Sequence, residues 1–309
     1  MIIYDTVIVG AGPAGMSAAL FAQGDNLNFR LSNKGIPCRF VEETINTNFT
    51  NLENYLGLYD LTGTDVAKIF RKHMEDREIP IFEEEIREIK SANNLFYVSS
   101  DREEYLTKTI ILATGTRPKE LVIPGVENVP KRIHYGIDRN FLHYADHDIL
   151  IIGGRNSGTV TSVRLKEMGA NPIIIEKSKN STAKEKYLKK LKELSIPLLT
   201  NSSLERIVGE GIITEAHLIV DGKPKIIKPI AIFGCIGYIP NNGLAIKLGL
   251  NLDNDGYIEV DRRMQTSKKG VYASGDVNGG VKMIAVASGE GAIAEYYANT
   301  FVRSEWKEE

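Results

Sequence analysis

Short apolar runs alternate along this chain with glycine-rich turns and stretches typical of helices. Residues 5–9 and 148–152 are short, mainly apolar runs. Glycines follow each at once, and helix-forming residues then occupy 16–23 and 159–168. A buried strand, a tight turn and a helix in this order are typical of a nucleotide-binding unit. The pattern therefore predicts an α/β fold with two Rossmann-like, three-layer nucleotide-binding domains.

The two turns carry the same glycine signature, and only the first copy is intact. The first reads Gly10, Ala11, Gly12, Pro13, Ala14, Gly15, and the second reads Gly153, Gly154, Arg155, Asn156, Ser157, Gly158. The first glycine makes the turn, the middle one lets the backbone approach a pyrophosphate, and the third lets the helix pack on the strand. Because Arg155 stands at the middle position, we expect the second nucleotide site to be degenerate.

Proline and asparagine mark two crossings between domains. Apolar runs at residues 109–115 and 231–237 both end in glycine, and proline follows each within a few residues. The second glycine signature lies between these crossings. The sequence therefore predicts a split first domain, residues 1–116 and 243–309, with a second domain inserted at 117–242.

Composition narrows the classes of protein. The chain has 309 residues, 25% charged residues and a net charge of −2, which gives no overall attraction to nucleic acid or an anionic membrane. No apolar run approaches the roughly 18 residues of a spanning helix, and Met1 leads into the first strand without a signal-peptide pattern, so we expect a cytoplasmic protein. Cys38 and Cys235 are too few for a disulfide framework or a zinc site, and we expect no metal.

Further motifs together identify a resemblance. They are Glu-Asn-Tyr-Leu-Gly at 53–57, Ala113-Thr114-Gly115, a Gly-to-Asn segment at 237–241, and Gly275-Asp276 before a helix predicted at 281–298. With the two glycine signatures, the chain resembles low-molecular-weight thioredoxin-reductase-type flavoproteins over nearly its whole length. The resemblance implies FAD in the split domain, a pyridine nucleotide in the inserted domain, a homodimer, and a hinge near Arg117 and Asn241.

The same resemblance implies the residues of the FAD site. They are Gly10, Gly12, Pro13, Ala14, Gly15, Asn33, Cys38, Arg39, Phe40, Asn54, Ala113, Thr114, Gly115, Gly275, Asp276, Lys282, Met283 and Ile284. Asp276 is implied to bind the ribityl chain, with an N-cap of the last helix as the alternative role. That helix is implied to direct its N-terminus at the flavin.

Several of these positions depart from the family pattern. Asn33 replaces the acid that binds the adenosine ribose, which weakens that bond without abolishing it. Cys38-Arg39-Phe40 replaces Gly-Gly-Gln, and Lys282-Met283 replaces Arg-Gln, so the pocket beside the flavin differs. Phe40 or Met283 is a candidate to cover the ring. Cys38 is a candidate redox thiol, with a buried structural role as the favoured alternative.

The redox-active dithiol of the family is missing. Its Tyr-Cys-x-x-Cys-Asp motif aligns with residues 135–140, where Gly136 and Arg139 occupy the two cysteine positions. Thiol exchange needs a thiolate, which neither residue supplies. We therefore expect an oxidoreductase that is not a conventional NADPH-thioredoxin reductase.

The second nucleotide site departs as well. Arg155 predicts steric exclusion of a pyrophosphate, although an arginine can also bind phosphate. Glu176 stands where relatives place the first residue of their 2′-phosphate cluster, and a carboxylate there opposes that phosphate but suits ribose hydroxyls. NADPH is thus not expected, NADH stays open, and no pyridine nucleotide is the leading case.

A lysine-rich segment offers a possible partner surface. Seven lysines and one acid, Glu185, lie between residues 177 and 192, while Tyr187, Leu188, Leu191 and Leu194 have helical spacing. Such a run is usually a solvated helix face, and it could also guide an acidic carrier such as ferredoxin or flavodoxin.

Several functions stay open at this point. The leading one is an FAD-dependent oxidoreductase that passes electrons between flavin and a protein carrier or small acceptor. The alternatives are a thiol or disulfide reductase acting through Cys38 or a partner's cysteines, an NADH-dependent flavin reductase, and a non-catalytic flavin-binding protein.

Overall fold

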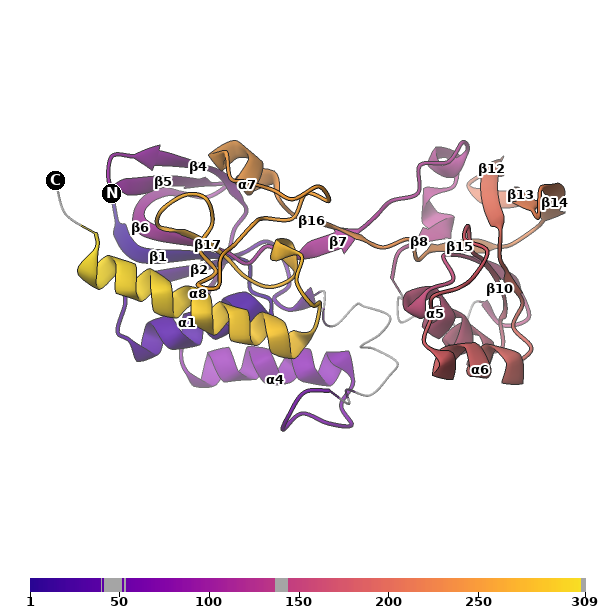
Figure 1. Cartoon of the computed structure of the whole chain (residues 1–309), viewed down its shortest axis with the longest axis horizontal. Helices are drawn as coiled ribbons and strands as arrows, with labels where there is room; N and C mark the ends of the chain where they lie inside the picture. The colour runs from indigo at the N-terminus through magenta and orange to yellow at the C-terminus, as the bar shows by residue number, and fades with distance from the viewer. Residues whose placement is uncertain (40, 42–51, 53, 137–143, 307–309) are drawn as a thin grey trace. The chain divides into compact units, whose positions relative to one another are not determined.

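A computed structural model describes residues 1–39, 41, 52, 54–136 and 144–306, and it divides the chain into two compact units (Figure 1). Among the described residues, unit 1 comprises 1–39, 41, 52, 54–117 and 239–306, and unit 2 comprises 118–136 and 144–238. The chain thus passes from one unit to the other between residues 117 and 118 and again between residues 238 and 239. The sequence predicts these boundaries at 116–117 and 242–243.

Unit 1 is built on a sheet of order β3-β2-β1-β6-β5-β4, with β17 added beside β6. Its parallel strands are β1 (Ile3–Val9), β2 (Phe29–Asn33), β3 (Ile81–Glu83), β6 (Glu104–Leu112) and β17 (Val271–Ala273). Two further strands, β4 (Ile86–Ala92) and β5 (Leu95–Ser100), pair antiparallel with their neighbours. The carboxyl ends of β1 and β6 therefore meet at one edge of this sheet.

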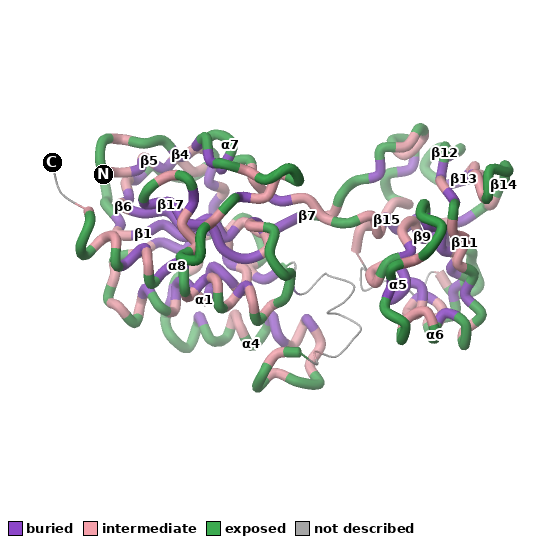
Figure 2. The backbone as a smooth tube through the Cα atoms, viewed as in Figure 1, coloured by how far each residue is buried: buried purple, intermediate pink, exposed green. Residues whose placement is uncertain are grey.

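Three layers cover the core of unit 1. Helices α1 (Pro13–Gly24), α4 (Gly63–Asp76) and α8 (Ile284–Ser304) lie on one face of the sheet (Figure 1). On the other face, a second core cluster joins side chains of β1, β6, β4 and β5 with the short helix α7 (Gly243–Leu248). The strands at the centre are buried along most of their length (Figure 2). These strands are apolar along nearly their whole length because both faces of the parallel part of the sheet are covered.

Unit 2 repeats this layering on a smaller scale. Its parallel sheet has the order β11-β10-β9-β15-β8. The strands are β8 (Ile133–His134), β9 (Asp148–Ile152), β10 (Asn171–Ile175), β11 (Leu198–Leu199) and β15 (Ala231–Gly234). Helices α5 (Asn156–Glu167) and α6 (Glu185–Glu193) pack on one face, and an antiparallel sheet of β12 (Ser202–Glu210), β13 (Ile212–Val220) and β14 (Lys223–Ile227) packs on the other.

Two short paired strands carry the chain between the units. They are β7 (Thr116–Pro118) and β16 (Tyr238–Pro240), and the Arg117 guanidinium donates a hydrogen bond to Asn241 Oδ1 at 3.1 Å. Asn241 also donates to the Thr114 carbonyl at 2.8 Å. The residues expected at a hinge are thus tied to each other by side-chain hydrogen bonds.

The predicted fold class is confirmed, and some element bounds differ from prediction. The last helix begins at Ile284 and continues to Ser304, rather than spanning 281–298. The segment 281–283 stays outside because Met283 has extended backbone and caps the helix without a side-chain bond. The described helices include none that is long and apolar enough to cross a membrane.

Candidate functional site

The first glycine turn joins β1 to α1 at the edge where the central strands end. Gly10 has φ +108°, and a Cβ there would lie 2.3 Å from the Ala113 carbonyl oxygen. A Cβ on Gly15 would lie 1.8 Å from the Gly10 carbonyl oxygen. Only glycine fits at these two positions, because one needs a left-handed backbone and the other a close helix–strand contact.

The middle glycine differs because it faces open space. A Cβ on Gly12 would meet nothing within 4 Å. Gly12 is the N-cap of α1, no side chain caps the helix, and Pro13 occupies its first turn. The free N–H groups and the positive end of the helix dipole are directed at this space. This bare turn is a cradle that fits a pyrophosphate, as the sequence predicts.

The start of α8 and the loop before it meet the same turn. A small buried cluster joins Ala14, Ala113 and Ala287, and a Cβ on Gly275 would lie 3.0 Å from the Ala14 Cβ. The N-terminus of α8 has no side-chain cap either. The structure therefore brings together the glycine turn, the Ala113–Gly115 segment and the Gly275–Asp276 loop, three of the groups that the sequence assigns to one site.

Asp276 lies at the start of a one-turn 3-10 helix, Asp276–Asn278. It is not the N-cap of α8, which begins eight residues later, so the structural alternative considered for this residue is wrong. Burial raises the pKa of the Asp276 carboxyl, and the positive charge of Lys282 opposes that rise. Asp276 is thus a partly buried acid in the loop beside the glycine turn.

Glu290 on α8 is a neighbour that the sequence did not single out. Its Oε2 accepts hydrogen bonds from the Gly275 N–H and from Asn278 Nδ2, both at 2.8 Å. Burial raises the pKa of this carboxyl despite these bonds, and the nearby Asp276 charge adds to the rise. Glu290 therefore holds the loop that carries Asp276. Its position two turns into a helix gave no sequence signal.

Asn33 takes part in the glycine turn itself. Its Oδ1 accepts a hydrogen bond from the Ala11 N–H at 2.9 Å, and its Nδ2 donates to the Gly35 carbonyl at 2.8 Å. Its amide thus ties the end of β2 to the turn. Ribose binding by Asn33, which the sequence suggests, would use its remaining acceptor capacity.

Cys38 also lies against this turn. Its side chain is only 3% exposed, its N–H donates to the Ala11 carbonyl at 2.9 Å, and its Sγ lies 3.6 Å from the Met16 Sδ. Its φ is +56°, unusual for a residue with a side chain. The thiol packs in the core beneath α1, which favours the structural role.

The remaining predicted residues are more dispersed. Lys282 donates to the Tyr257 hydroxyl, and Met283 is 45% exposed before the first residue of α8, Ile284. Arg39 and Asn54 are exposed, and no hydrogen bond among the described residues joins Asn54 to the glycine turn. Phe40 and Arg139 lie outside the described residues. Gly136 follows β8, partly exposed.

The second glycine turn has the backbone of the first. Gly153 has φ +106°, and a Cβ on Gly158 would lie 1.8 Å from the Gly153 carbonyl oxygen. Arg155, the N-cap of α5, has φ −82° and ψ −170°, against −83° and −173° for Gly12. The arginine therefore leaves the backbone of the turn undistorted and adds an exposed cationic side chain at its N-cap position. Arg155 forms no ion pair or hydrogen bond through its side chain with another described residue.

The segment after β10 is tied to this turn by side chains. Ser181 Oγ donates to the Gly154 carbonyl at 2.5 Å, and Asn156 Oδ1 accepts from the Lys184 N–H at 2.8 Å. Glu176 accepts from the N–H groups of Gly154 at 2.7 Å and Ser178 at 3.0 Å. Burial works to raise the pKa of Glu176, but these backbone bonds outweigh it and hold the pKa below its usual value.

The apolar run 231–237 predicted from the sequence contains Cys235. In the structure β15 ends at Gly234, so Cys235 lies directly after the strand. Burial raises the pKa of its thiol to about 11, so the thiolate is disfavoured. Its Sγ lies 3.6 Å from the Thr161 hydroxyl. Cys235 is thus suited to packing and not to thiol exchange.

Comparison with known proteins defines the class. The model of the pyridine nucleotide-disulphide oxidoreductase family matches residues 4–291, and the chain belongs to that family. It is a thioredoxin-reductase-like oxidoreductase, and membership implies the use of FAD and a pyridine nucleotide.

Individual relatives agree with this assignment. A thioredoxin reductase of Listeria monocytogenes is 28% identical over 97% of this chain and 94% of its own. The crystal structure of T. acidophilum thioredoxin reductase is 31% identical, with 98% of this chain and 99% of that one covered and a TM-score of 0.88. A ferredoxin-flavin thioredoxin reductase from Clostridium acetobutylicum shares the fold at 23% identity, with 98% of each chain covered and a TM-score of 0.55.

Proposed function

We propose that this protein is an FAD-dependent oxidoreductase that exchanges electrons with an acidic protein carrier, without an internal dithiol and with NADPH use impaired. The observation that carries the proposal is Arg155, which places an exposed arginine at the middle position of a second glycine turn that is otherwise intact. The resemblance also implies a homodimer, which sedimentation of the purified protein tests.

FAD fits the first site on three features of unit 1. The uncapped turn at Gly12 would hold the pyrophosphate through backbone N–H groups. Asp276, held by its loop beside Glu290, would accept a hydrogen bond from a hydroxyl of the cofactor. The uncapped N-terminus of α8 would favour negative charge on the bound ring. When bound, FAD supplies a redox centre that accepts and releases electrons.

The second glycine turn would disfavour NADPH for two reasons. The Arg155 side chain starts at the position where a glycine elsewhere leaves the turn bare for a pyrophosphate. Glu176 is an ionised carboxylate with lowered pKa, and it would repel a 2′-phosphate at this end of β10. The family's use of pyridine nucleotide is therefore proposed to be weakened here, with NADH less affected than NADPH.

An exposed lysine face on unit 2 would supply the alternative contact. The seven lysines between residues 177 and 192 are all exposed; they are Lys177, Lys179, Lys184, Lys186, Lys189, Lys190 and Lys192. Leu191 on α6 is buried, and Tyr187, Leu188 and Leu194 are partly buried against the same core, so the lysines of the helix face outward. Lys190 forms an ion pair with Glu193 at 3.8 Å.

Such a face raises the rate of encounter with an acidic partner. Ferredoxin and flavodoxin are acidic electron carriers. One solved structure with the same fold is named as a ferredoxin-flavin thioredoxin reductase. The sequence has no Cys-x-x-Cys motif, so a redox group of the partner itself would receive or deliver the electrons.

Two measurements test this function. The absorption spectrum of the purified protein should show bound flavin, and a colourless protein that FAD does not reconstitute contradicts the proposal. Replacing Lys186, Lys189 and Lys190 together by glutamate should slow anaerobic electron exchange with ferredoxin at least tenfold at low salt. The matched variant replaces Lys223, Lys225 and Lys228, which lie on or beside β14, and should change the rate little. Equal slowing by both variants would remove the lysine face from the proposal.

A further inference from the structure

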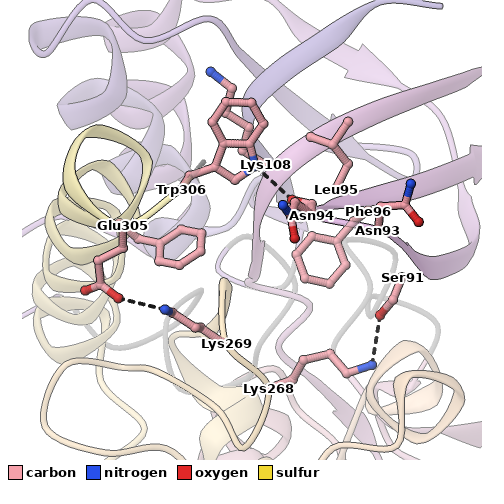
Figure 3. A pocket seen from close by; sticks show the side chains of 11 residues that line it. Ser91, Asn93, Asn94, Leu95, Phe96, Lys108, Lys268, Lys269, Glu305 and Trp306 are labelled. Atoms are coloured by element: carbon pink, nitrogen blue, oxygen red, sulfur yellow. Dashed lines mark hydrogen bonds and ion pairs between the residues drawn. The ribbon is translucent and has the colours of Figure 1, made fainter. Parts of the chain in front are cut away.

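A cavity of about 420 Å³ opens in unit 1 away from the glycine turn (Figure 3). Its walls come from the β4–β5 turn, from β6, from the loop before β17 and from the end of α8. Lys108 lies on the half of β6 that pairs with the start of β1, whereas Ala113 at the glycine turn follows the other end of the same strand. The cavity is therefore separate from the proposed FAD site.

Aromatic rings form the floor and one wall of this cavity. Phe96 and Phe301 converge on Gly270, where a Cβ would lie 3.3 Å from each ring. Gly270 has φ +76°, so a side chain is disfavoured there by backbone as well as by space. The Trp306 indole forms the wall and is fixed by a hydrogen bond from its Nε1 to the Asn94 carbonyl at 2.8 Å. A flat apolar body can lie against these rings.

Three lysines line the same cavity. Lys108 bonds Asp5 at 2.8 Å, and its Nζ lies 4.5 Å from the centre of the Trp306 ring. Lys269 pairs with Glu305 at 3.1 Å, and both of these side chains are largely exposed. Lys268 donates to the neutral Ser91 hydroxyl at 3.1 Å and has no ion pair with a described residue (Figure 3). The charge of Lys268 is thus available to a ligand.

We propose that this cavity binds an organic anion that carries an aromatic ring, with its phosphate or carboxylate at Lys268 and its ring against Phe96, Phe301 and Trp306. The volume lies within the range of small-molecule sites, in which a few polar groups orient a ligand among apolar ones. A compact ammonium group binds phosphate and carboxylate as a point charge. The site is independent of the electron donor proposed above.

The chain contains a reporter for this site, because Trp306 is its single tryptophan. Titrating the flavin-bound protein with adenosine monophosphate and separately with benzoate should change tryptophan fluorescence in a saturable way. Adenosine, which has the ring without the charge, and inorganic phosphate, which has the charge without the ring, should each bind at least tenfold more weakly than adenosine monophosphate. A response to only one of the two anions supports the proposal and identifies the head group.

Variants separate this cavity from other anion sites. Lys268→Met should weaken binding tenfold or more. Lys269→Met is a second variant that should also weaken binding. Neither substitution should change the unfolding temperature. Lys68→Met, an exposed lysine on α4 of the same unit, should leave binding unchanged. Arg155→Gly should also leave the tryptophan response intact. The proposal is overturned by no saturable response to either anion, by equal responses with adenosine or phosphate alone, or by full binding in Lys268→Met.

Discussion

The Oε2 atom of Glu176 accepts a hydrogen bond from the Gly154 N–H at 2.7 Å. In unit 1 the Asn33 Oδ1 atom holds the Ala11 N–H in the same way, at 2.9 Å. Each glycine turn is thus fixed by a polar residue at the end of the next strand, Asn33 as the last residue of β2 and Glu176 directly after β10. A residue expected to serve a cofactor ribose also stabilises the protein's own backbone.

Glu176→Ala should therefore destabilise unit 2. It leaves the buried Gly154 N–H without its partner, which costs about 1–3 kcal/mol. Since the folded-state pKa of Glu176 lies below its usual 4.5, the stabilisation is present above that pH and is lost as pH falls through the folded pKa. Urea unfolding of both proteins across this range should show the difference shrinking in acid. Glu210→Ala, at an exposed acid on β12, is the control and should change little.

Replacing Arg155 by glycine should restore nucleotide binding. The backbone of the turn already matches that of the intact copy, so only the side chain has to be removed. Calorimetry should show NADH binding at least tenfold more tightly to Arg155→Gly than to the original protein, with a smaller gain for NADPH. Arg155→Lys is the matched variant that keeps the charge. Weaker binding in both variants would mean that Arg155 is a phosphate ligand.

Asp276→Ala should reduce retention of FAD. The variant removes a partly buried acceptor beside the glycine turn, and one lost hydrogen bond of this kind corresponds to roughly tenfold in affinity. The ratio of flavin to protein absorbance after gel filtration measures the loss. Asp255→Ala changes an exposed acid in the same unit and should keep its flavin. Full retention by Asp276→Ala would remove this residue from the proposed site.

The free energy of unfolding should fall as pH rises, because the Glu295 carboxyl is buried. Both of its carboxylate oxygens are buried without a hydrogen-bond partner among the described residues. Burial, together with the charge of Asp25, raises its pKa from 4.5 to about 7. Stability is therefore fully present below pH 4.5 and is lost as pH rises through about 7, by up to about 3 kcal/mol.

The isosteric variant Glu295→Gln isolates this effect. Its free energy of unfolding should match that of the original protein in acid and exceed it increasingly toward pH 7. Parallel urea midpoints across the whole range would show that Glu295 does not titrate in this way.

Local chemistry allowed much of the fold to be predicted. The glycine turns follow from short-range rules, because a strand, left-handed glycine and a close helix contact leave few alternatives. The inward spacing of Leu191 and its neighbours likewise identified α6, and the structure confirms it.

What escaped prediction depends on contacts between distant segments. Glu290 and Glu295 look like ordinary helix acids in the sequence. Glu295 is buried and Glu290 is partly buried because α8 packs closely on α1, where a Cβ on Gly291 would lie 2.0 Å from the Ala14 carbonyl oxygen. The cavity beside Trp306 also joins four separate segments, and no local pattern predicts such a meeting.

Identifying the electron donor is the most direct test of the proposed function. The flavin-bound protein is mixed anaerobically with NADPH, NADH and reduced ferredoxin in turn, and loss of flavin absorbance is followed. Reduced ferredoxin should bleach the protein at least a hundredfold faster than NADPH, with NADH between them or equal to NADPH. Rapid bleaching by NADPH, with slow bleaching by ferredoxin, would contradict the proposed role of Arg155 and the carrier proposal together.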